Sequence, residues 1–192
     1  MGSDKAFLEL AGKSLIVRAL EVAHQVVTDV RIVGDAKKFA PYGPVVEDVY
    51  PNRGPLGGIH AALAQSQKEC NLMLAVDLPF VPAEFLKYLL ARAESSAATV
   101  TVPSLNGFFQ PLCAVYRRQF LAAAEPRLAE NRNKIDQLFR EIPLCTVSEA
   151  DLVEHGFDGS IFRNLNTPED WQRATKDFAK NSPGSFKFPP RI

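Results

Sequence analysis

The apolar stretch LMLAV, residues 72–76, constrains the fold of this chain more than any other feature. It shows no polar alternation, which is the pattern of a central strand buried on both faces. The run stops at Asp77-Leu78-Pro79, a combination typical of a strand end followed by a turn. A strand of this kind needs a layer of structure on each side, so the pattern predicts helices on both faces of a sheet.

Helix-like and strand-like patterns alternate along the rest of the chain. Near the C-terminus, Thr167-Pro168-Glu169-Asp170 combines a threonine cap, a proline at the first helical position and an acid three residues after the cap. The other predicted helices cover residues 15–27, 59–67, 82–93, 119–130 and 134–140, and the other predicted strands cover 30–33, 45–46, 98–103 and 112–116. This alternation predicts an α/β fold with a mostly parallel sheet.

Length and composition favour one domain. The 192 residues, 46% of them hydrophobic, are enough for one sizeable core. We therefore predict a single domain over residues 1–180, followed by a flexible, proline-rich tail at 181–192.

The balance of charge argues against a polymeric partner. Lys+Arg and Asp+Glu are equal at 22 each, and no like-charge run is present, so neither nucleic acid nor a membrane surface is the predicted partner. The three cysteines lack a C-x-x-C spacing, which excludes a sequence-predicted disulfide framework or zinc site. With no signal-peptide pattern and no membrane-length apolar run, we expect a cytoplasmic protein.

Two acids and a glycine-rich loop follow predicted strands. Asp48 follows one strand and Asp77 another, and the loop after Asp48 carries RGPLGG, residues 53–58, into a helix. Ligands of open α/β sheets bind beyond the carboxyl ends of the strands, and glycines at a helix start let backbone N–H groups approach an anion. If Lys5 lies at the same end of the sheet, the pattern predicts a site that binds a phosphate and a divalent cation together.

Each of these features has an ordinary structural explanation when it stands alone. Asp77 could be only a turn former, Gly57-Gly58 could serve tight loop–helix packing, and Lys5 could be a solvated surface residue. Phe108-Phe109 is a hairpin pair that could also border a ligand, and Cys113 is expected to be a buried small hydrophobe. The functional interpretation therefore depends on the combination and its order.

Five ordered blocks carry a family resemblance: MGSDKAFLELAGKSLIVR, EDVYPNRGPLGGI, LMLAVDLPFVP, QPLCAVY and FRNLNTPED. In this order they resemble the molybdenum cofactor guanylyltransferases, the MobA-type nucleotidyltransferases, over roughly residues 1 to 178. The resemblance implies a Rossmann-like fold of the nucleotide-diphospho-sugar transferase type. It also implies transfer of GMP from GTP to molybdopterin, which forms the guanine dinucleotide cofactor and releases pyrophosphate.

The resemblance also assigns roles by motif. Lys5 and Asp77 would be the catalytic residues, with Lys5 on the GTP phosphates and Asp77 holding Mg²⁺ and nucleotide. Further nucleotide contacts would come from Asp48, Gly54 and Gly57, and the pterin side would be formed by Gln110, Asn164 and Asn166. Besides GTP and molybdopterin, partners could include proteins that mature molybdoenzymes. Catalysis would consist of positioning and charge neutralisation, with no covalent nucleophile.

The family pattern places a strand and a glycine-rich loop before the M-G-x-D-K block with which this chain begins. That strand lies in the middle of the family sheet, and the loop contacts guanine and triphosphate. Either the natural protein carries about 10 to 20 more residues, the length of one strand plus a loop, or the chain is a genuine short form. We favour the first, because Lys5, Asp48, Asp77 and both asparagines are all present. We also expect weak or absent nucleotide binding, and an inactive enzyme, for the 192-residue chain by itself.

Other functions remain open at this stage. The nearest is another nucleotidyltransferase of the same fold, one that uses CTP with molybdopterin or joins a nucleotide to a sugar phosphate. A second is a non-catalytic protein that binds pterin or nucleotide. A third is a structural module on the same scaffold, which fold alone does not exclude.

Overall fold

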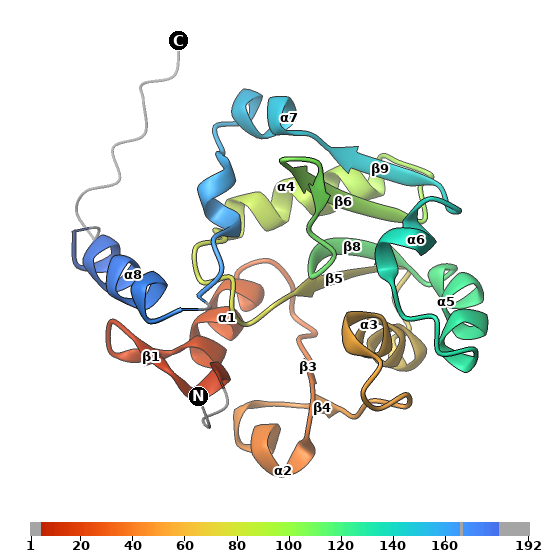
Figure 1. The fold of residues 1–192 in the computed structure, drawn as a ribbon, viewed down its shortest axis with the longest axis horizontal. Coiled ribbons are helices and arrows are strands. Elements are labelled where there is room, and N and C mark those ends of the chain that lie inside the picture. The colour runs from red at the N-terminus through yellow and green to blue at the C-terminus, as the bar shows by residue number, and fades with distance from the viewer. Residues whose placement is uncertain (1–4, 166, 181–192) are drawn as a thin grey trace.

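The structure is a computed structural model that describes residues 5–165 and 167–180 (Figure 1). Two sequence predictions fall outside these residues: the position of Asn166 and the flexible tail at 181–192. The division into one domain plus a tail therefore stays a prediction.

Strands and helices alternate along the described chain. The strands are β1 (Glu9–Leu10), β2 (Lys13–Ser14), β3 (Ile32–Val33), β4 (Val45–Val46), β5 (Cys70–Leu74), β6 (Val100–Leu105), β7 (Phe108–Phe109), β8 (Cys113–Arg117) and β9 (Leu144–Val147). The α-helices are α1 (Leu15–His24), α2 (Ala36–Phe39), α3 (Gly54–Gln65), α4 (Ala83–Glu94), α5 (Phe120–Ala129), α6 (Ile135–Phe139), α7 (Glu149–Glu154) and α8 (Pro168–Lys180). Three 3₁₀ turns are η1 (Lys5–Phe7), η2 (Ala40–Tyr42) and η3 (Gly159–Phe162).

The main sheet is mixed. Its order is β5-β8-β6-β7, with β9 on β6. Strand β8 runs antiparallel to both β5 and β6, whereas β6 and β9 are parallel, so β5, β6 and β9 share one direction. Strands β3 and β4 form a separate parallel pair. The α/β class is confirmed, with two further antiparallel pairs at β1–β2 and β6–β7. The prediction of a mostly parallel sheet is corrected to a mixed one for the described residues, because β8 runs antiparallel to both of its neighbours.

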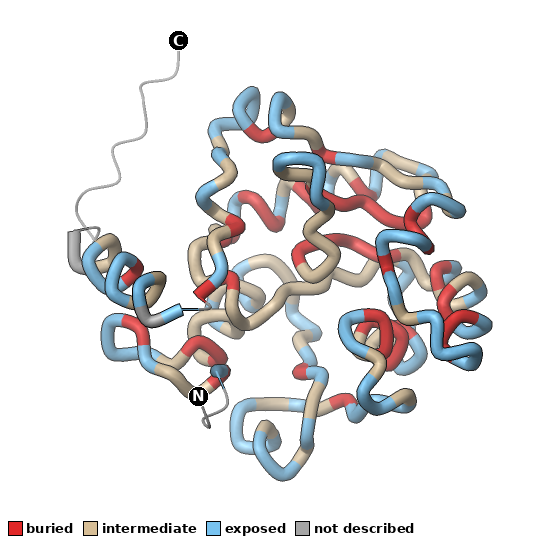
Figure 2. Tube along the Cα trace, viewed as in Figure 1, coloured by how far each residue is buried: buried red, intermediate tan, exposed pale blue. Residues whose placement is uncertain are grey.

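Helices cover both faces of the main sheet, as predicted. On one face, α3, α5 and α6 pack against alternate residues of β6 and β8 around Tyr116 and Phe120. On the other face, α4 and α7 pack around Phe85 and Leu152. Figure 2 shows this burial in red along β6 and β8, whereas α2 is pale blue and tan and has no buried residue. The core therefore sits on the central strands.

The expectation of a central position for β5 is wrong within the described residues. This strand hydrogen-bonds to β8 only, and all five of its residues are half-buried. Its faces are nevertheless covered, because Met73 packs with the α3–α5 side and Leu72 with the α4–α7 side. The apolar pattern of a strand indicates that both of its faces are covered. It does not indicate whether neighbouring strands pair with both of its edges.

Two local signals are confirmed and one boundary is corrected. Asn106 and Gly107 have φ of 52° and 78°, as in a two-residue hairpin turn between β6 and β7. The Thr167 hydroxyl accepts a hydrogen bond from the Asp170 amide at 3.1 Å, and the Asp170 carboxylate accepts one from the Thr167 amide at 2.9 Å. Helix α3, predicted over 59–67, begins at Gly54 with a proline in its first turn.

Tyr116 fixes the chain that leads into β8. Its side chain is fully buried, and its hydroxyl donates to the Pro111 carbonyl at 2.8 Å. Burial raises the pKa of Tyr116 well above its usual range, so the hydroxyl keeps its proton. The hydrogen bond therefore persists across the ordinary pH range.

We predict that Tyr116→Phe lowers the free energy of unfolding by about 1 to 3 kcal/mol, because the Pro111 carbonyl loses its donor inside the fold. Urea denaturation measures this change. The matched control is Tyr42→Phe, whose side chain is exposed in η2 and whose change should be close to zero. Equal effects of the two substitutions would contradict the prediction.

Candidate functional site

The carboxyl ends of β5, β6 and β9 lie at one edge of the main sheet, where β8 begins. Asp77 follows β5 in a turn whose Leu78 amide bonds to the Ala75 carbonyl at 3.3 Å. The Ala75 amide in turn donates to the Leu112 carbonyl at 2.7 Å. Asp77 and Gln110 are each two residues beyond this bond, so the pairing brings both to the same edge.

Val76 connects the other predicted residues to this edge. Its side chain packs in one cluster with Ala6, the neighbour of Lys5, and in another with Leu165, the neighbour of Asn164. Lys5 lies in η1 and is exposed, and Asn164 is also exposed. Three segments far apart in the sequence thus meet around the residue that precedes Asp77. We call the region around this end of the sheet, where the segments that carry Lys5, Asp77, Gln110 and Asn164 lie, the rim.

Asp48 and the glycines lie at the start of α3. The Asp48 carboxylate accepts a hydrogen bond from the Tyr50 amide at 3.1 Å. The same oxygen lies 3.1 Å from the point where a Cβ on Gly57 would be, and the Tyr50 carbonyl lies 3.0 Å from it. A side chain on Gly57 would therefore push against Asp48. The carboxylate itself occupies the first turn of the helix, a place that favours negative charge.

The loop reaches α3 through two left-handed residues. Asn52 has φ of 63°, and Gly54, the first residue of α3, has φ of 62°, a backbone region that favours glycine. A Cβ on Gly54 would meet no atom within 4 Å, which means that its backbone angle, and not the space around it, favours glycine. The conformation of Gly54 and the close approach at Gly57 are separate reasons for two glycines.

The described residues fit a cation only with help from a substrate. Among residues 5–165 and 167–180, no group of three or more His, Cys, Asp or Glu side chains could hold a metal ion. Asp77 is half-buried at the rim, and within that part of the chain its carboxylate makes no hydrogen bond or ion pair. A single carboxylate suits Mg²⁺ that is bound largely by phosphate oxygens.

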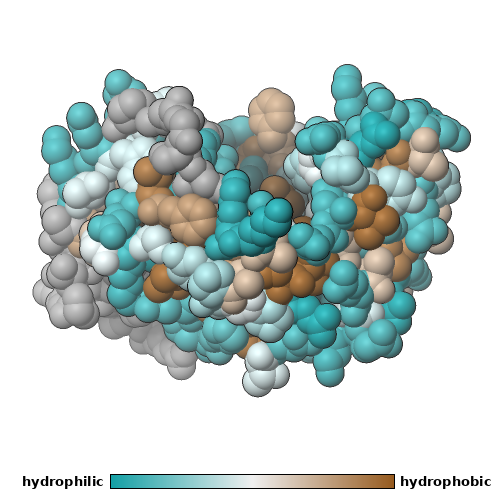
Figure 3. Space-filling view, turned by 90° about the horizontal axis from the view of Figure 1, so that it is seen from below, coloured by the Kyte–Doolittle hydropathy of each residue, from teal (hydrophilic) through white to brown (hydrophobic). Residues whose placement is uncertain are grey.

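The cysteine and the phenylalanine pair behave differently. Cys113 is fully buried, and burial raises the pKa of its thiol far above the usual range, as expected of a core residue. Phe109 packs against Phe139 with ring centroids 5.3 Å apart, whereas Phe108 is 73% exposed on the same hairpin. Figure 3 shows apolar side chains in separate patches among polar ones on the face it presents.

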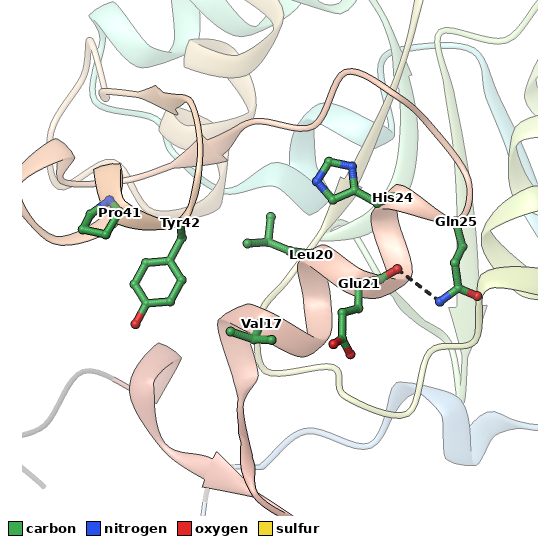
Figure 4. A pocket seen from close by; sticks show the side chains of 7 residues that line it. All are labelled: Val17, Leu20, Glu21, His24, Gln25, Pro41 and Tyr42. Carbon is green, nitrogen blue, oxygen red and sulfur yellow. Dashed lines mark hydrogen bonds between the residues drawn. The ribbon is translucent and has the colours of Figure 1, made fainter. Parts of the chain in front are cut away.

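A cavity of about 650 Å³ lies between α1 and η2 (Figure 4). Leu20, His24 and Tyr42 are among the residues that line it. Its one acid, Glu21, pairs with Lys13 at 2.7 Å. None of the sequence-predicted site residues lines it, so it has no place in the candidate site.

Sequence patterns did not identify Arg163, whose guanidinium lies over the Phe80 ring beside the rim. The two residues lie far apart in the sequence, and only the folded chain brings them together. Nor does any helix of the described chain have the length and apolar character needed to cross a bilayer.

A family model, the MobA-like NTP transferase domain, matches residues 1–145. The chain belongs to the MobA-like NTP transferases. The sequence-based resemblance is thereby confirmed at the level of the family, and the chain is a nucleotidyltransferase by membership. The match covers η1, the α3 loop and the Asp77 turn, which are the three parts of the candidate nucleotide site.

Relatives carry more specific names. A probable molybdenum cofactor guanylyltransferase of Carboxydothermus hydrogenoformans is 29% identical over 180 residues, covering 93% of this chain and 90% of the relative. One of Pelotomaculum thermopropionicum is 33% identical over 184 residues, covering 95% and 88%. The crystal structure of molybdopterin-guanine dinucleotide biosynthesis protein A from Archaeoglobus fulgidus superposes with a TM-score of 0.82 at 26% identity, covering 93% and 92%.

The two neighbouring glycines of this MobA-like domain should respond oppositely to alanine. A Cβ on Gly58 would meet only the Val33 side chain at 3.5 Å, so Gly58→Ala should stabilise α3 by up to about 1 kcal/mol. Gly57→Ala should be about 1 to 3 kcal/mol less stable than Gly58→Ala, because its Cβ crowds the Tyr50 carbonyl and Asp48. Urea denaturation measures the unfolding free energies of the two variants. Equal stabilisation by both substitutions would show that the loop before α3 shifts to accommodate a Cβ on Gly57.

Proposed function

We propose that this domain transfers GMP from GTP to molybdopterin, forming the molybdopterin guanine dinucleotide and releasing pyrophosphate. The observation that supports the proposal is that the segments carrying Lys5, Asp77 and Asn164 pack in two clusters that share Val76. Family membership and the names of the relatives support the nucleotidyl transfer.

Asp77 is the residue we propose for Mg²⁺. It lies at the carboxyl end of β5, half-exposed, and its carboxylate is without a hydrogen-bond partner in the described chain. When bound, the cation supplies positive charge to the triphosphate. The role of Asp77 is to hold that charge at a fixed position at the carboxyl end of β5. The site then needs no reorganisation during the reaction.

Lys5 and the α3 loop would share the nucleotide. Lys5 is exposed and would place a compact positive charge near the phosphates. Asp48 already presents a carboxylate to the start of α3, so it suits the N–H or hydroxyl donors of base and ribose better than phosphate oxygens. Gly54 would serve through its left-handed backbone conformation, and Gly57 by letting the loop come this close to the helix.

Gln110 and Asn164 would form the pterin side. Gln110 is held by its own backbone, since its amide donates to the Pro103 carbonyl at 2.9 Å and its carbonyl accepts from the Cys113 amide at 3.0 Å. The Gln110 side chain therefore belongs to a backbone segment that is fixed just before β8. Asn166, the third residue assigned to this side, lies outside the described residues and stays a prediction.

In this proposal, catalysis depends mainly on the positioning of the reacting groups. The terminal phosphate of molybdopterin attacks the α-phosphorus of GTP. The bond between the α-phosphorus and the oxygen that bridges to the β-phosphorus breaks, and pyrophosphate leaves with the electron pair of that bond. Elements anchored by the β5–β8 ladder hold the reacting groups in place, and no side-chain nucleophile takes part. A cytoplasmic location and contact with proteins that mature molybdoenzymes belong to the same proposal.

We predict that Asp77→Ala reduces GMP transfer by about 100-fold or more, because the site loses the carboxylate that holds Mg²⁺. The assay measures pyrophosphate release with GTP, molybdopterin and Mg²⁺. It compares the 192-residue chain with a version extended upstream in its own reading frame, since the sequence predicts weak nucleotide binding by the former. The control is Asp29→Ala, an exposed acid paired with Arg31 before β3.

Unfolding curves of Asp77→Ala and the unchanged protein should nearly coincide, because this carboxylate makes no hydrogen bond within the described chain. Retained transfer by Asp77→Ala would exclude the metal role. Repeating the assay with CTP in place of GTP tests the base, and faster transfer of CMP would reassign the substrate while keeping the reaction.

A further inference from the structure

Arg163 joins three elements next to the rim. Its guanidinium carbon lies 4.1 Å from the centroid of the Phe80 ring, in the turn that follows Asp77. One terminal nitrogen of the same group donates to the Asp177 carboxylate of α8 at 2.7 Å. One side chain thus contacts both the turn after β5 and the C-terminal helix.

The contact extends into a column of two stacked rings with a guanidinium at each end. The Phe80 ring stacks on Phe178 of α8 at 5.2 Å, and the guanidinium of Arg18 in α1 lies 4.6 Å from the Phe178 centroid. Arg18 is itself fixed, because its Nε donates to the Leu10 carbonyl at 2.9 Å. We call Arg18, Phe178, Phe80 and Arg163 the Arg–Phe column.

The column ends beside two residues of the proposed site. Phe80 comes three positions after Asp77, and Arg163 directly precedes Asn164. We propose that Arg163 is a positioning residue: through Phe80 it holds the Asp77 turn against the Asn164 segment and so sets the spacing between the metal side and the pterin side. Arg163 holds the turn in the free protein, and the effect of Arg163 on turnover rests on the proposed function.

The geometry requires arginine in particular. The Arg163 Nε is buried without a hydrogen-bond partner in the described chain, where the guanidinium contacts the ring beneath it and donates to Asp177. A planar guanidinium can stack on a ring and donate at its edge at the same time. A lysine ammonium keeps the charge and can reach Asp177, but it has no flat face for Phe80.

The test compares Arg163→Lys and Phe80→Leu with Arg117→Lys. Arg117 is a matched control at the far end of β8: it is also half-buried, pairs with Glu69 at 3.3 Å and donates to the Ala93 carbonyl at 2.9 Å. Hydrogen exchange read by mass spectrometry follows peptides that cover residues 77–81 and 163–165. The transfer assay gives kcat and KM for the same proteins.

We expect amides of residues 77–81 to exchange about fivefold faster in Arg163→Lys and Phe80→Leu than in the unchanged protein. In Arg117→Lys these amides should stay as they are, at a similar loss of thermal stability. We also expect kcat to fall by about tenfold or more in the two column variants. The KM for GTP should change less than kcat, because Lys5, Asp48 and the glycines are intact.

Unchanged exchange at residues 77–81 in both column variants overturns the inference, whatever the activity. Faster exchange with kcat equal to that of Arg117→Lys confines the column to stability and also overturns it as a positioning device. If the unchanged protein transfers no GMP either as the 192-residue chain or as the version extended upstream, the proposed function fails, while the exchange data still decide whether Arg163 holds the Asp77 turn.

Discussion

The antiparallel pairing of β5 with β8 is the interaction on which the rest of the structure depends. Five residue pairs, from Cys70↔Arg117 to Leu74↔Cys113, fix the register, and the bond from the Ala75 amide to the Leu112 carbonyl closes the ladder. A slip of one residue would exchange the two faces of β5 and move Met73 to the opposite core. The same slip would move Asp77 away from Gln110, so one register serves both the core and the site.

Around this ladder, the N-terminal segment and the C-terminal segment are attached through Val76. Ala6 and Leu165 both pack in clusters with it, although one lies in η1 and the other shortly before α8. The α3 loop is attached differently, since Tyr50 and Leu56 belong to the cluster on the α3–α5 face. The candidate nucleotide site therefore combines residues held by separate parts of the core, and a change in either part can alter it alone.

Local signals predicted most elements, and they did so where a short stretch decides the outcome. The Asn106-Gly107 turn and the Thr167-Pro168-Glu169-Asp170 helix start are determined within four residues, and both are found. Helix α7 was missed because its capping box pairs Ser148 with Asp151, whereas the usual sequence signature carries Glu or Gln three residues after the cap. The start of α3 was placed too late because glycines weaken a helical pattern, even though Gly57 and Gly58 are inside the helix.

The site could be predicted as a set of residues but not as an arrangement. Asp48 and Asp77 both follow strands, yet β4 and β5 belong to different sheets, and the structure ties Asp48 to α3 through the Tyr50 amide. Sequence gives the order of strands along the chain, whereas pairing is decided by contacts across the fold. The Arg163–Phe80 contact shows the same limit, because a charge above a ring has no spacing rule in the sequence. Residue types that do the chemistry can therefore be read locally, while the residues that hold them in position emerge only from the fold.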